Sequence, residues 1–513
     1  MPRSFWTGAA AGCAFLVVEL AGRVLAGVPT IPELIQDRLV LLLPGPLFAF
    51  VLDRLLYLGK PSLFIGLGVI QLLLAGLGGV LFQRWRQPIA AALIPWLLTG
   101  LVVLPAAGRG IFAGAAAVAL VDLLAFAAYA AALSAYSGRP AAAEAAGADG
   151  PPVPGGAAAL DRRAALGGGL TFLASLLLGR QIIGALPSLP PRPGAAPVPP
   201  AATPAAGTGA RAASTPPPTA ADPSPITPIE QFYVVSKNLI DPVVDASSWK
   251  LRISGHVQQP LTLTYSDILA LPSVEAYRTL ECISNEVGGD LISTGLWTGV
   301  RLADLLRRAG VAPEATLLVF TSVDGYTESM PLPRALDPAT LLAYRLNGQP
   351  LPPKHGFPLR VLGTGTYGMK NPKWLTEIQV ATSAPPGFWE RQGWSADAIV
   401  QTMSRIDTPA DGATLGPGPV IVRGIAFAGD RGIQKVELSA DGGRSWQAAA
   451  LSQPLGPNTW TLWHTTWRPP GAGTYELTVR ATDGSGRLQA GTATDTFPAG
   501  ATGYHTISVR VTT

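Results

Sequence analysis

The stretch HGFPLRVLGTGTYGMKNPKW, residues 355–374, is the part of the sequence that best indicates the fold. It places His355 and Arg360 five positions apart and follows them with a glycine-rich loop and two lysines. Glycine lets backbone N–H groups approach an anion closely, and lysine adds positive charge. The stretch therefore predicts a site for a phosphate-bearing cofactor, with a β-rich loop and solvated lysines as the alternative.

A second stretch, TLECISNE at residues 279–286, contains Cys282, one of only two cysteines in the chain. A lone cysteine is often a small buried apolar residue, and it can also be a nucleophile or a redox thiol. As a metal ligand it would suit a soft transition metal. Because the sequence has no Cys/His cluster of the kind that holds zinc, most ligands of such a metal must come from a cofactor.

Together these stretches resemble the sulfite oxidase family of molybdopterin enzymes. The Cys282 stretch, Trp297-Thr298-Gly299-Val300, the run at 355–360 and Tyr367 to Trp374 all fit that family, over roughly residues 229–513. The resemblance implies that Cys282 is the thiolate ligand of molybdenum and the catalytic centre. It also implies a set of positions that contact the pterin and its phosphate: Tyr233, Val234, Thr321, His355, Arg360, Asn371, Pro372 and Lys373.

The sequence departs from the family where a sulfite anion would bind. Two positions at which sulfite oxidases have arginine are Val235 and Val287, and the position of their active-site tyrosine is Trp394. An oxyanion favours paired cations, although Lys237 or Arg391 could supply one. A methionine sulfoxide-type reductase of the same family, which also lacks these arginines, is therefore an alternative.

The predicted fold has three parts joined by a linker. Residues 1–185 form an α-helical transmembrane bundle, 186–228 a Pro/Ala-rich linker, 229–400 an α+β molybdopterin-binding domain and 401–513 an all-β immunoglobulin-like sandwich. In the α+β domain we expect strands near 249–257, 261–265 and 317–321, a short helix capped by Ser266, and an amphipathic helix over 302–309 ended by Gly310. The resemblance implies that the sandwich mediates dimerisation, so a homodimer is possible.

The bundle is indicated by a chain that is 48% hydrophobic but only 14% charged. About six apolar segments have nearly the ~20-residue length that spans a membrane: 7–29, 37–57, 62–83, 88–107, 110–136 and 164–185. Within the first, Glu19 and Arg23 are spaced to pair on one helix face. Loops rich in arginine orient the bundle, so we expect a multi-pass protein of the cytoplasmic membrane with its catalytic domain on the extracytoplasmic side. Arg162 and Arg163 resemble a twin-arginine export signal, or are a positive flank.

The first 255 residues contain no histidine, and Met1 is their only methionine. Haem iron needs an axial ligand such as these, and iron–sulfur clusters need several cysteines. We therefore expect no haem and no iron–sulfur cluster, and electrons exchanged with a separate carrier or a quinone. The net charge of +4 without a dense basic run makes nucleic-acid binding improbable.

The sequence thus predicts a membrane-anchored oxidoreductase that uses molybdenum–molybdopterin for two-electron oxygen-atom transfer on a small molecule, as sulfite oxidases do. A non-catalytic, membrane-tethered binding module is the alternative from another class.

Overall fold

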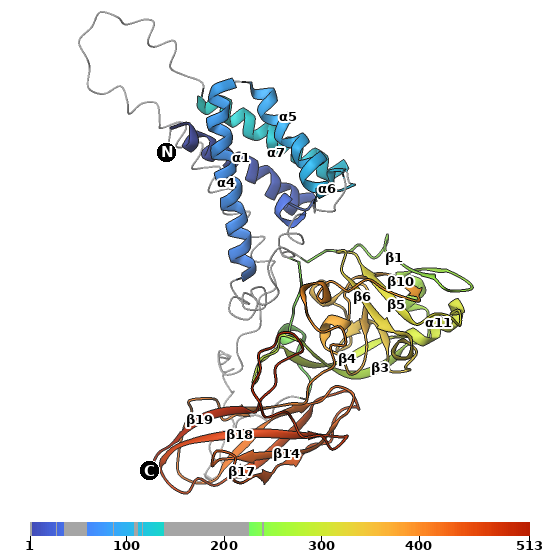
Figure 1. Ribbon diagram of the computed structural model, residues 1–513, viewed down its shortest axis with the longest axis vertical. Coiled ribbons are helices and arrows are strands. Elements are labelled where there is room, and N and C mark those ends of the chain that lie inside the picture. Colours follow the sequence, from blue (N-terminus) through green and yellow to red (C-terminus); the bar gives the residue numbers. More distant parts are fainter. Residues whose placement is uncertain are drawn as a thin grey trace, which may run out of the picture. The chain divides into compact units, whose positions relative to one another are not determined.

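The computed structural model describes residues 3–26, 28–34, 59–85, 87–106, 111–114, 116–137, 225–238 and 241–513. The chain divides into two compact units, one built mainly from the N-terminal residues 1–188 and one that contains residues 244–513. Figure 1 labels their elements. The predicted segments 37–57 and 164–185 and the Arg162–Arg163 pair lie outside the described residues.

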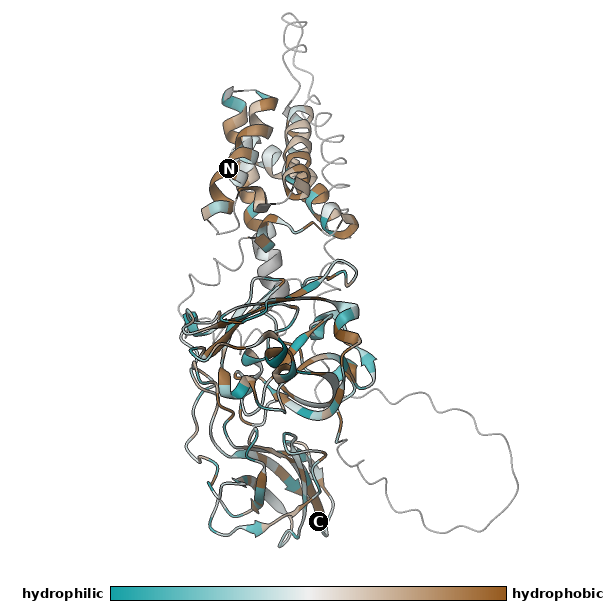
Figure 2. Cartoon of the chain, turned by 90° about the vertical axis from the view of Figure 1, so that its right-hand side faces the viewer, coloured by the Kyte–Doolittle hydropathy of each residue, from teal (hydrophilic) through white to brown (hydrophobic). Residues whose placement is uncertain are grey.

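Long apolar helices make up the N-terminal unit (Figure 2). They are α1 Arg3–Ala26, α4 Gly59–Trp85, α5 Pro88–Leu98, which continues through a π-helical turn Thr99–Val103 into α6 Leu104–Ala106, and α7 Ala116–Ser137; a 3-10 turn covers Ile111–Gly114. Three helices, Ser4–Ala26, Pro88–Ala106 and Ala116–Tyr136, are long and apolar enough to cross a membrane. Four of the predicted apolar segments therefore correspond to helices.

Small residues and a few hydrogen bonds hold these helices together. A Cβ on Gly8 of α1 would lie 2.8 Å from the backbone of Gly79 in α4, so the two backbones are nearly in contact. The prediction that Arg23 pairs with Glu19 is wrong. Arg23 instead forms an ion pair with Glu33 (Nε–Oε1 3.0 Å), and Glu19 accepts a hydrogen bond from the Ile31 amide at 2.6 Å.

The α+β domain contains two β-sheets. One has the strand order β2-β1-β10-β5-β6, and the other has β3-β4-β7-β8 with β9 paired to β7. The strands are β1 Lys250–Gly255, β2 Leu261–Thr264, β3 Val274–Glu281, β4 Ile292–Arg301, β5 Leu317–Ser322, β6 Thr327–Pro331, β7 Leu341–Leu346, β8 Gln349–Pro350, β9 Arg360–Leu362 and β10 Leu375–Ala381. The helices are α10 Tyr265–Leu269, α11 Leu302–Ala309 and α12 Leu332–Ala335, and 3-10 turns cover Ile229–Gln231, Pro353–His355, Gly368–Lys370 and Glu390–Gln392.

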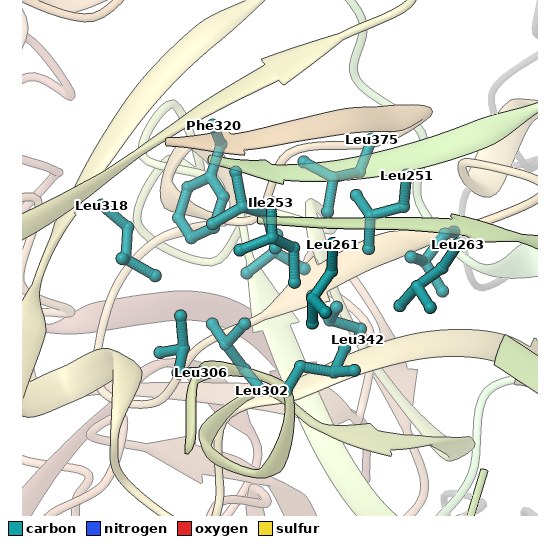
Figure 3. Close-up of a cluster of buried hydrophobic side chains, with 14 of the residues drawn as sticks. Leu251, Ile253, Leu261, Leu263, Leu302, Leu306, Leu318, Phe320, Leu342 and Leu375 are labelled. Atoms are coloured by element: carbon teal, nitrogen blue, oxygen red, sulfur yellow. The ribbon is translucent and has the colours of Figure 1, made fainter. Parts of the chain in front are cut away.

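Apolar residues of the first sheet, of helix α11 and of the second sheet, such as Leu342 on β7, build one core (Figure 3). Leu318 and Phe320 on β5 are fully buried, and Leu302 and Leu306 of α11 face the same cluster. The predicted end of α11 is confirmed, because Gly310 adopts a left-handed φ of 68°. The cap predicted for the short helix is wrong. Thr264 caps α10, since its side chain and that of Asp267 bond reciprocally to each other's backbone N–H.

The C-terminal residues form a sandwich of two sheets, as predicted. The first sheet has the order β11-β13-β17-β16 and the second β12-β19-β18-β14-β15. Their strands are β11 Met403–Thr408, β12 Thr414–Leu415, β13 Val420–Phe427, β14 Ile433–Ser439, β15 Gln447–Ala448, β16 Ala450–Leu451, β17 Thr461–Trp467, β18 Gly473–Asp483 and β19 His505–Val511. Trp463 from one sheet and Leu477 from the other belong to the same buried cluster, so the two inner faces share one core.

The core role of α11 is testable with two adjacent residues. Leu306→Ala should lower the free energy of unfolding of the α+β domain by about 2–5 kcal/mol, because Leu306 is fully buried and truncation leaves a cavity. Arg307→Ala should cost less than about 1 kcal/mol, because Arg307 makes only an exposed ion pair with Asp304. Differential scanning calorimetry of both variants would check this, and equal losses would contradict the assignment of the buried face.

Candidate functional site

Cys282 follows the last residue of β3 and begins the loop that leads into β4. Its amide donates to the Leu291 carbonyl at 2.9 Å, which closes the loop. The Asn285 side chain braces it from within, donating to Glu281 Oε1 at 2.9 Å and accepting from the Leu291 amide at 2.9 Å. Cys282 is only 8% exposed and forms no disulfide, and its Sγ lies 3.1 Å from Ser284 Oγ. The thiol is therefore buried in a fixed backbone frame.

Arg360, the first residue of β9, connects two neighbouring loops. Its guanidinium donates to the carbonyls of His355 (3.1 Å) and Asn371 (3.2 Å), and it lies 5.2 Å from the centre of the Trp297 ring. His355 is also buried, with its ring edge against Phe232. Burial, together with the nearby charges of Arg360 and two lysines, lowers the pKa of His355 to about 3. The imidazole is therefore neutral at physiological pH.

Asn371 organises the glycine-rich loop. Its Oδ1 accepts from the Gly363 amide at 2.6 Å, and its Nδ2 donates to the Tyr367 carbonyl at 3.2 Å. The Pro372 carbonyl accepts from the Val361 amide at 2.9 Å. Lys373 donates to the Lys354 carbonyl at 3.0 Å, and its ammonium lies 4.2 Å from the centre of the Trp374 ring. The loop is thus held by side-chain bonds as well as by its own backbone.

Tyr233 and Val234 are buried beside these loops. The Tyr233 amide donates to Ser293 Oγ at 3.1 Å, and a Cβ on Gly368 would lie 2.7 Å from the Tyr233 hydroxyl and 3.4 Å from the Glu281 carbonyl. Tyr233 therefore lies where the glycine-rich loop meets the strand that carries Cys282. Burial, with Cys282 close by, holds the pKa of Tyr233 well above its usual value.

Thr321 differs from the other predicted residues. It lies on β5, where its backbone pairs with Thr327 and Glu377, and its carbonyl accepts from Thr376 Oγ1 at 3.1 Å. These contacts tie Thr321 to the first sheet, whereas Tyr233, His355, Arg360 and Asn371 are linked through the loops around Cys282.

Several buried polar side-chain atoms of the α+β domain have no hydrogen-bond partner. They include His355 Nε2, Arg360 Nε, Thr366 Oγ1, Ser322 Oγ, both amide atoms of Gln392 and Trp394 Nε1. Residues 401–513, all of which the structure describes, contribute none. Native proteins leave few such atoms unpaired, so this concentration fits a large polar ligand that would satisfy them. Gln392, Thr366 and Ser322 have no distinguishing signal in the sequence, because these residue types are ordinary surface residues.

A metal bound here would need ligands from a cofactor. Within the described ranges, no group of three or more His, Cys, Asp or Glu side chains is arranged to hold a metal ion. Cys282 can supply one soft thiolate, and the unpaired donor of Arg360 with the neutral His355 can bind the polar parts of an organic cofactor. These residues fit molybdopterin, whose dithiolene sulfurs would provide further ligands.

The C-terminal sandwich contacts the loop that follows Cys282. A Cβ on Gly288, which has a φ of 76°, would lie 2.3 Å from the His505 ring, so only glycine fits there. Arg405 Nη1 donates to the Gly289 carbonyl at 2.5 Å, and the Ile406 amide donates to His505 Nδ1 at 3.0 Å. Strands β11 and β19 therefore support the thiol-bearing loop from outside its own domain.

Arg391 and Lys237, the two cations that could substitute for arginine at Val235 and Val287, have partners of their own. Val287 is 39% exposed at the loop after Cys282. Arg391 donates to the Pro386 carbonyl at 2.7 Å and lies 5.9 Å from the centre of the Phe388 ring, and Lys237 donates to Asn238 Oδ1 at 3.0 Å.

A buried ion network lies next to the glycine-rich loop. Lys370 Nζ is 2.7 Å from Glu328 Oε1 and 2.6 Å from Glu390 Oε1. Burial raises the pKa of Glu328 to about 7, although the Lys370 ammonium acts in the opposite direction.

Comparison with known proteins gives consistent matches. A family model described as "Oxidoreductase molybdopterin binding domain" matches residues 238–389, and one described as "Bacterial Ig domain" matches residues 404–479. The chain is 32% identical to sulfite oxidase of Gallus gallus over 315 residues, covering 52% of this chain and 68% of that one. It is 33% identical to sulfite oxidase of Arabidopsis thaliana, covering 45% of this chain and 71% of that one.

Other relatives are matched over a smaller part of their length. The chain is 34% identical to mitochondrial sulfite oxidase of Macaca fascicularis, covering 50% of this chain and 55% of that one, and so spans about half the length of such relatives. The crystal structure of the sulfane dehydrogenase SoxCD from Paracoccus pantotrophus has a TM-score of 0.50 at 24% identity, covering 55% of this chain and 80% of that one. This last likeness is one of fold.

The pKa of Glu328 gives a pH-dependent prediction. Because its folded-state pKa of about 7 lies above the ordinary 4.5, Glu328 favours the folded state below pH 4.5, and this contribution is lost as the pH rises through 7. The free energy of unfolding of the unaltered protein should therefore fall between pH 5 and pH 8. In the Glu328→Gln variant this fall should be smaller by about 2–3 kcal/mol. Urea denaturation at both pH values would measure the difference. The exposed Glu476→Gln is the control, and identical pH dependence in both variants would contradict the prediction.

Proposed function

The chain belongs to the sulfite oxidase family of molybdopterin-binding oxidoreductases, and on this premise we propose that it is a membrane-anchored enzyme for two-electron oxygen-atom transfer on a small molecule. The observation that carries the proposal is that one domain contains the buried Cys282 thiol and the buried Arg360 Nε and His355 Nε2 atoms, which have no hydrogen-bond partner. Each unpaired buried group destabilises the fold, so these atoms favour a bound ligand, and the thiol favours one that contains a metal.

Each residue at this site has a definite task in the proposed enzyme. Molybdopterin, when bound, supplies a metal that changes its oxidation state by two electrons. Cys282 provides the protein's thiolate ligand to it. Arg360 and Lys373 neutralise the cofactor's phosphate, and the neutral His355 hydrogen bonds without adding charge. Asn371, Pro372, Tyr233 and Val234 shape the loops that surround the pterin, and Thr321 is assigned to the cofactor only by the family resemblance.

An uncharged sulfur- or nitrogen-containing substrate suits this site better than sulfite. Val235 and Val287 offer neither charge nor hydrogen-bond donors, and Arg391 is engaged with Pro386 and Phe388. The buried Gln392 amide and Trp394 indole are neutral groups whose polar atoms are unpaired. A neutral oxygen acceptor such as a sulfoxide could bond to them, which favours a sulfoxide-type reductase as the second candidate.

We propose the following setting for the enzyme. The apolar helices anchor it as a multi-pass protein of the cytoplasmic membrane, with the catalytic domain on the extracytoplasmic side. Electrons pass to or from a separate carrier or a quinone, because residues 1–255 offer no histidine for haem and the chain has no cysteine cluster for iron–sulfur. The sandwich at 401–513 offers a surface for a homodimer.

The two cysteines allow a matched test of the metal ligand. Cys282→Ser should lower turnover roughly 100-fold or more while most of the pterin is retained. Even substitution of a residue that only hydrogen bonds to a metal ligand lowers activity or metal affinity about 10–100-fold. Cys13→Ser, in helix α1, should leave both turnover and pterin content unchanged. The measurements are turnover with an artificial electron carrier and pterin fluorescence after oxidation. Full activity of Cys282→Ser would disprove the assignment.

The preference for an uncharged substrate over sulfite can be tested by introducing an arginine at position 287. Sulfite should be a poor substrate, and Val287→Arg should raise its kcat/KM about tenfold or more, because a charge-assisted hydrogen bond contributes roughly 1.5–3 kcal/mol. The same variant should not improve kcat/KM for an uncharged sulfoxide. Efficient sulfite turnover by the unaltered protein would refute the preference for uncharged substrates.

A further inference from the structure

Lys370 is a buried cation that bridges two carboxylates from different parts of the α+β domain. Its side chain is 8% exposed, that of Glu328 is fully buried and that of Glu390 is 11% exposed. Glu328 lies on β6, and Glu390 begins the 3-10 turn Glu390–Gln392. Lys370 itself ends the turn Gly368–Lys370, immediately before Asn371, Pro372 and Lys373. The bridge thus joins the end of the glycine-rich loop to strand β6 and to the turn Glu390–Gln392.

Further contacts fasten residues 387–394 at the same place. Glu390 Oε2 accepts from the Gly387 amide at 2.9 Å, and the Phe388 amide donates to the Thr327 carbonyl at 3.0 Å. A Cβ on Gly387 would lie 2.8 Å from Glu328 Oε1, so this backbone passes directly over the buried carboxylate. The network therefore fixes one end of the segment to β6.

The rest of the segment leads to the glycine-rich loop. The Tyr367 amide donates to the Ala398 carbonyl at 2.8 Å, and the Val400 amide donates to the Gly365 carbonyl at 3.1 Å. Between these two anchors lie Gln392, which is 7% exposed with both amide atoms unpaired, and Trp394, which is 4% exposed with Nε1 unpaired. The segment carries the unpaired groups and is held at both ends by these anchors. Between them, the Trp394 ring centre lies 5.3 Å from that of Phe497, and the Ser395 amide donates to the Pro498 carbonyl at 2.9 Å.

A buried ion pair is an expensive way to gain stability, because desolvation offsets most of the Coulomb energy. What it does provide is a defined geometry, since the ammonium must satisfy two acceptors at once. Here the two acceptors are the residues that set the distance between β6 and the segment.

We propose that Lys370 is a positioning residue. Its ion pairs attach residues 387–394 to the glycine-rich loop and so hold Gln392 and Trp394 in place for substrate. The inference rests on the proposed function only in naming substrate as the partner of these two side chains. Lys370 itself contacts carboxylates and does not reach the reacting atoms.

The test uses the full chain loaded with its cofactor and compares Lys370→Met with Lys435→Met. Lys435 is the control because it also forms a Lys–Glu ion pair, with Glu437 at 2.6 Å, but on strand β14 of the sandwich and with its own side chain 52% exposed. Hydrogen exchange of the backbone amides is measured in residues 387–394 and in the distant strand β17. We expect exchange in 387–394 to rise about tenfold in Lys370→Met, with β17 unchanged and pterin content retained.

Kinetics provide a second readout on the same samples. KM for the preferred substrate should rise more than kcat falls, and Lys370→Arg should restore both exchange and KM, because arginine can also bond to two carboxylates. If Lys370→Met does not fold, Glu390→Gln removes one charge at the same size and should accelerate exchange in 387–394. Unchanged exchange in that segment, or an equal increase throughout the domain, would overturn the proposal. If hydrogen exchange in residues 387–394 changes as expected but the unaltered protein has no turnover, the proposed function is disproved and the positioning role of Lys370 is not.

Discussion

The Arg360 guanidinium is the buried cation on which the site depends, because it donates to the carbonyls of two loops that backbone bonds and the Lys373 side chain also join. One arginine side chain joins the turn that ends at His355 to the turn that precedes Lys373, and it stacks on Trp297 from the second sheet. Its remaining nitrogen stays unpaired inside the protein. An anion would offset the desolvation of a cation buried in this way, so the same residue organises the loops and suits the phosphate of the proposed cofactor.

The site is also a product of two domains. The thiol-bearing strand β3 is bound by the sandwich before it reaches Cys282, since the Thr279 amide donates to the Asn458 carbonyl at 2.9 Å and the Trp460 amide donates to Thr279 Oγ1 at 2.8 Å. Past Cys282, His505 and Arg405 contact Gly288 and Gly289. The sandwich therefore supports strand β3 and the loop after Cys282 within one chain, independently of any dimer that it forms.

Much of this organisation was accessible from the sequence. The amphipathic helix α11 with its terminal Gly310 and the alternating strands have strong local signals, and the structure confirms these elements. The Cys282 and His355 stretches are equally clear in the sequence, and their roles at a cofactor site stay predictions. The sequence could not predict pairing between distant residues. The four-residue spacing predicts that Arg23 pairs with Glu19, but its partner is Glu33, which lies beyond the helix end and also accepts from the Thr30 amide. Gln392 and the Lys370 network were missed for the same reason, because burial and partner choice are set by packing.

The contact of His505 with Gly288 has a consequence for how the protein is made. Strand β19, which carries His505, follows the whole α+β domain in the chain, and it supports a loop encoded more than two hundred residues earlier. A nascent chain that has finished only the α+β domain therefore lacks the support for its thiol loop. Cofactor loading should then follow translation of the sandwich. A ribosome stalled before β19 would leave a chain that contains Cys282 but lacks the His505 contact that supports the loop after it.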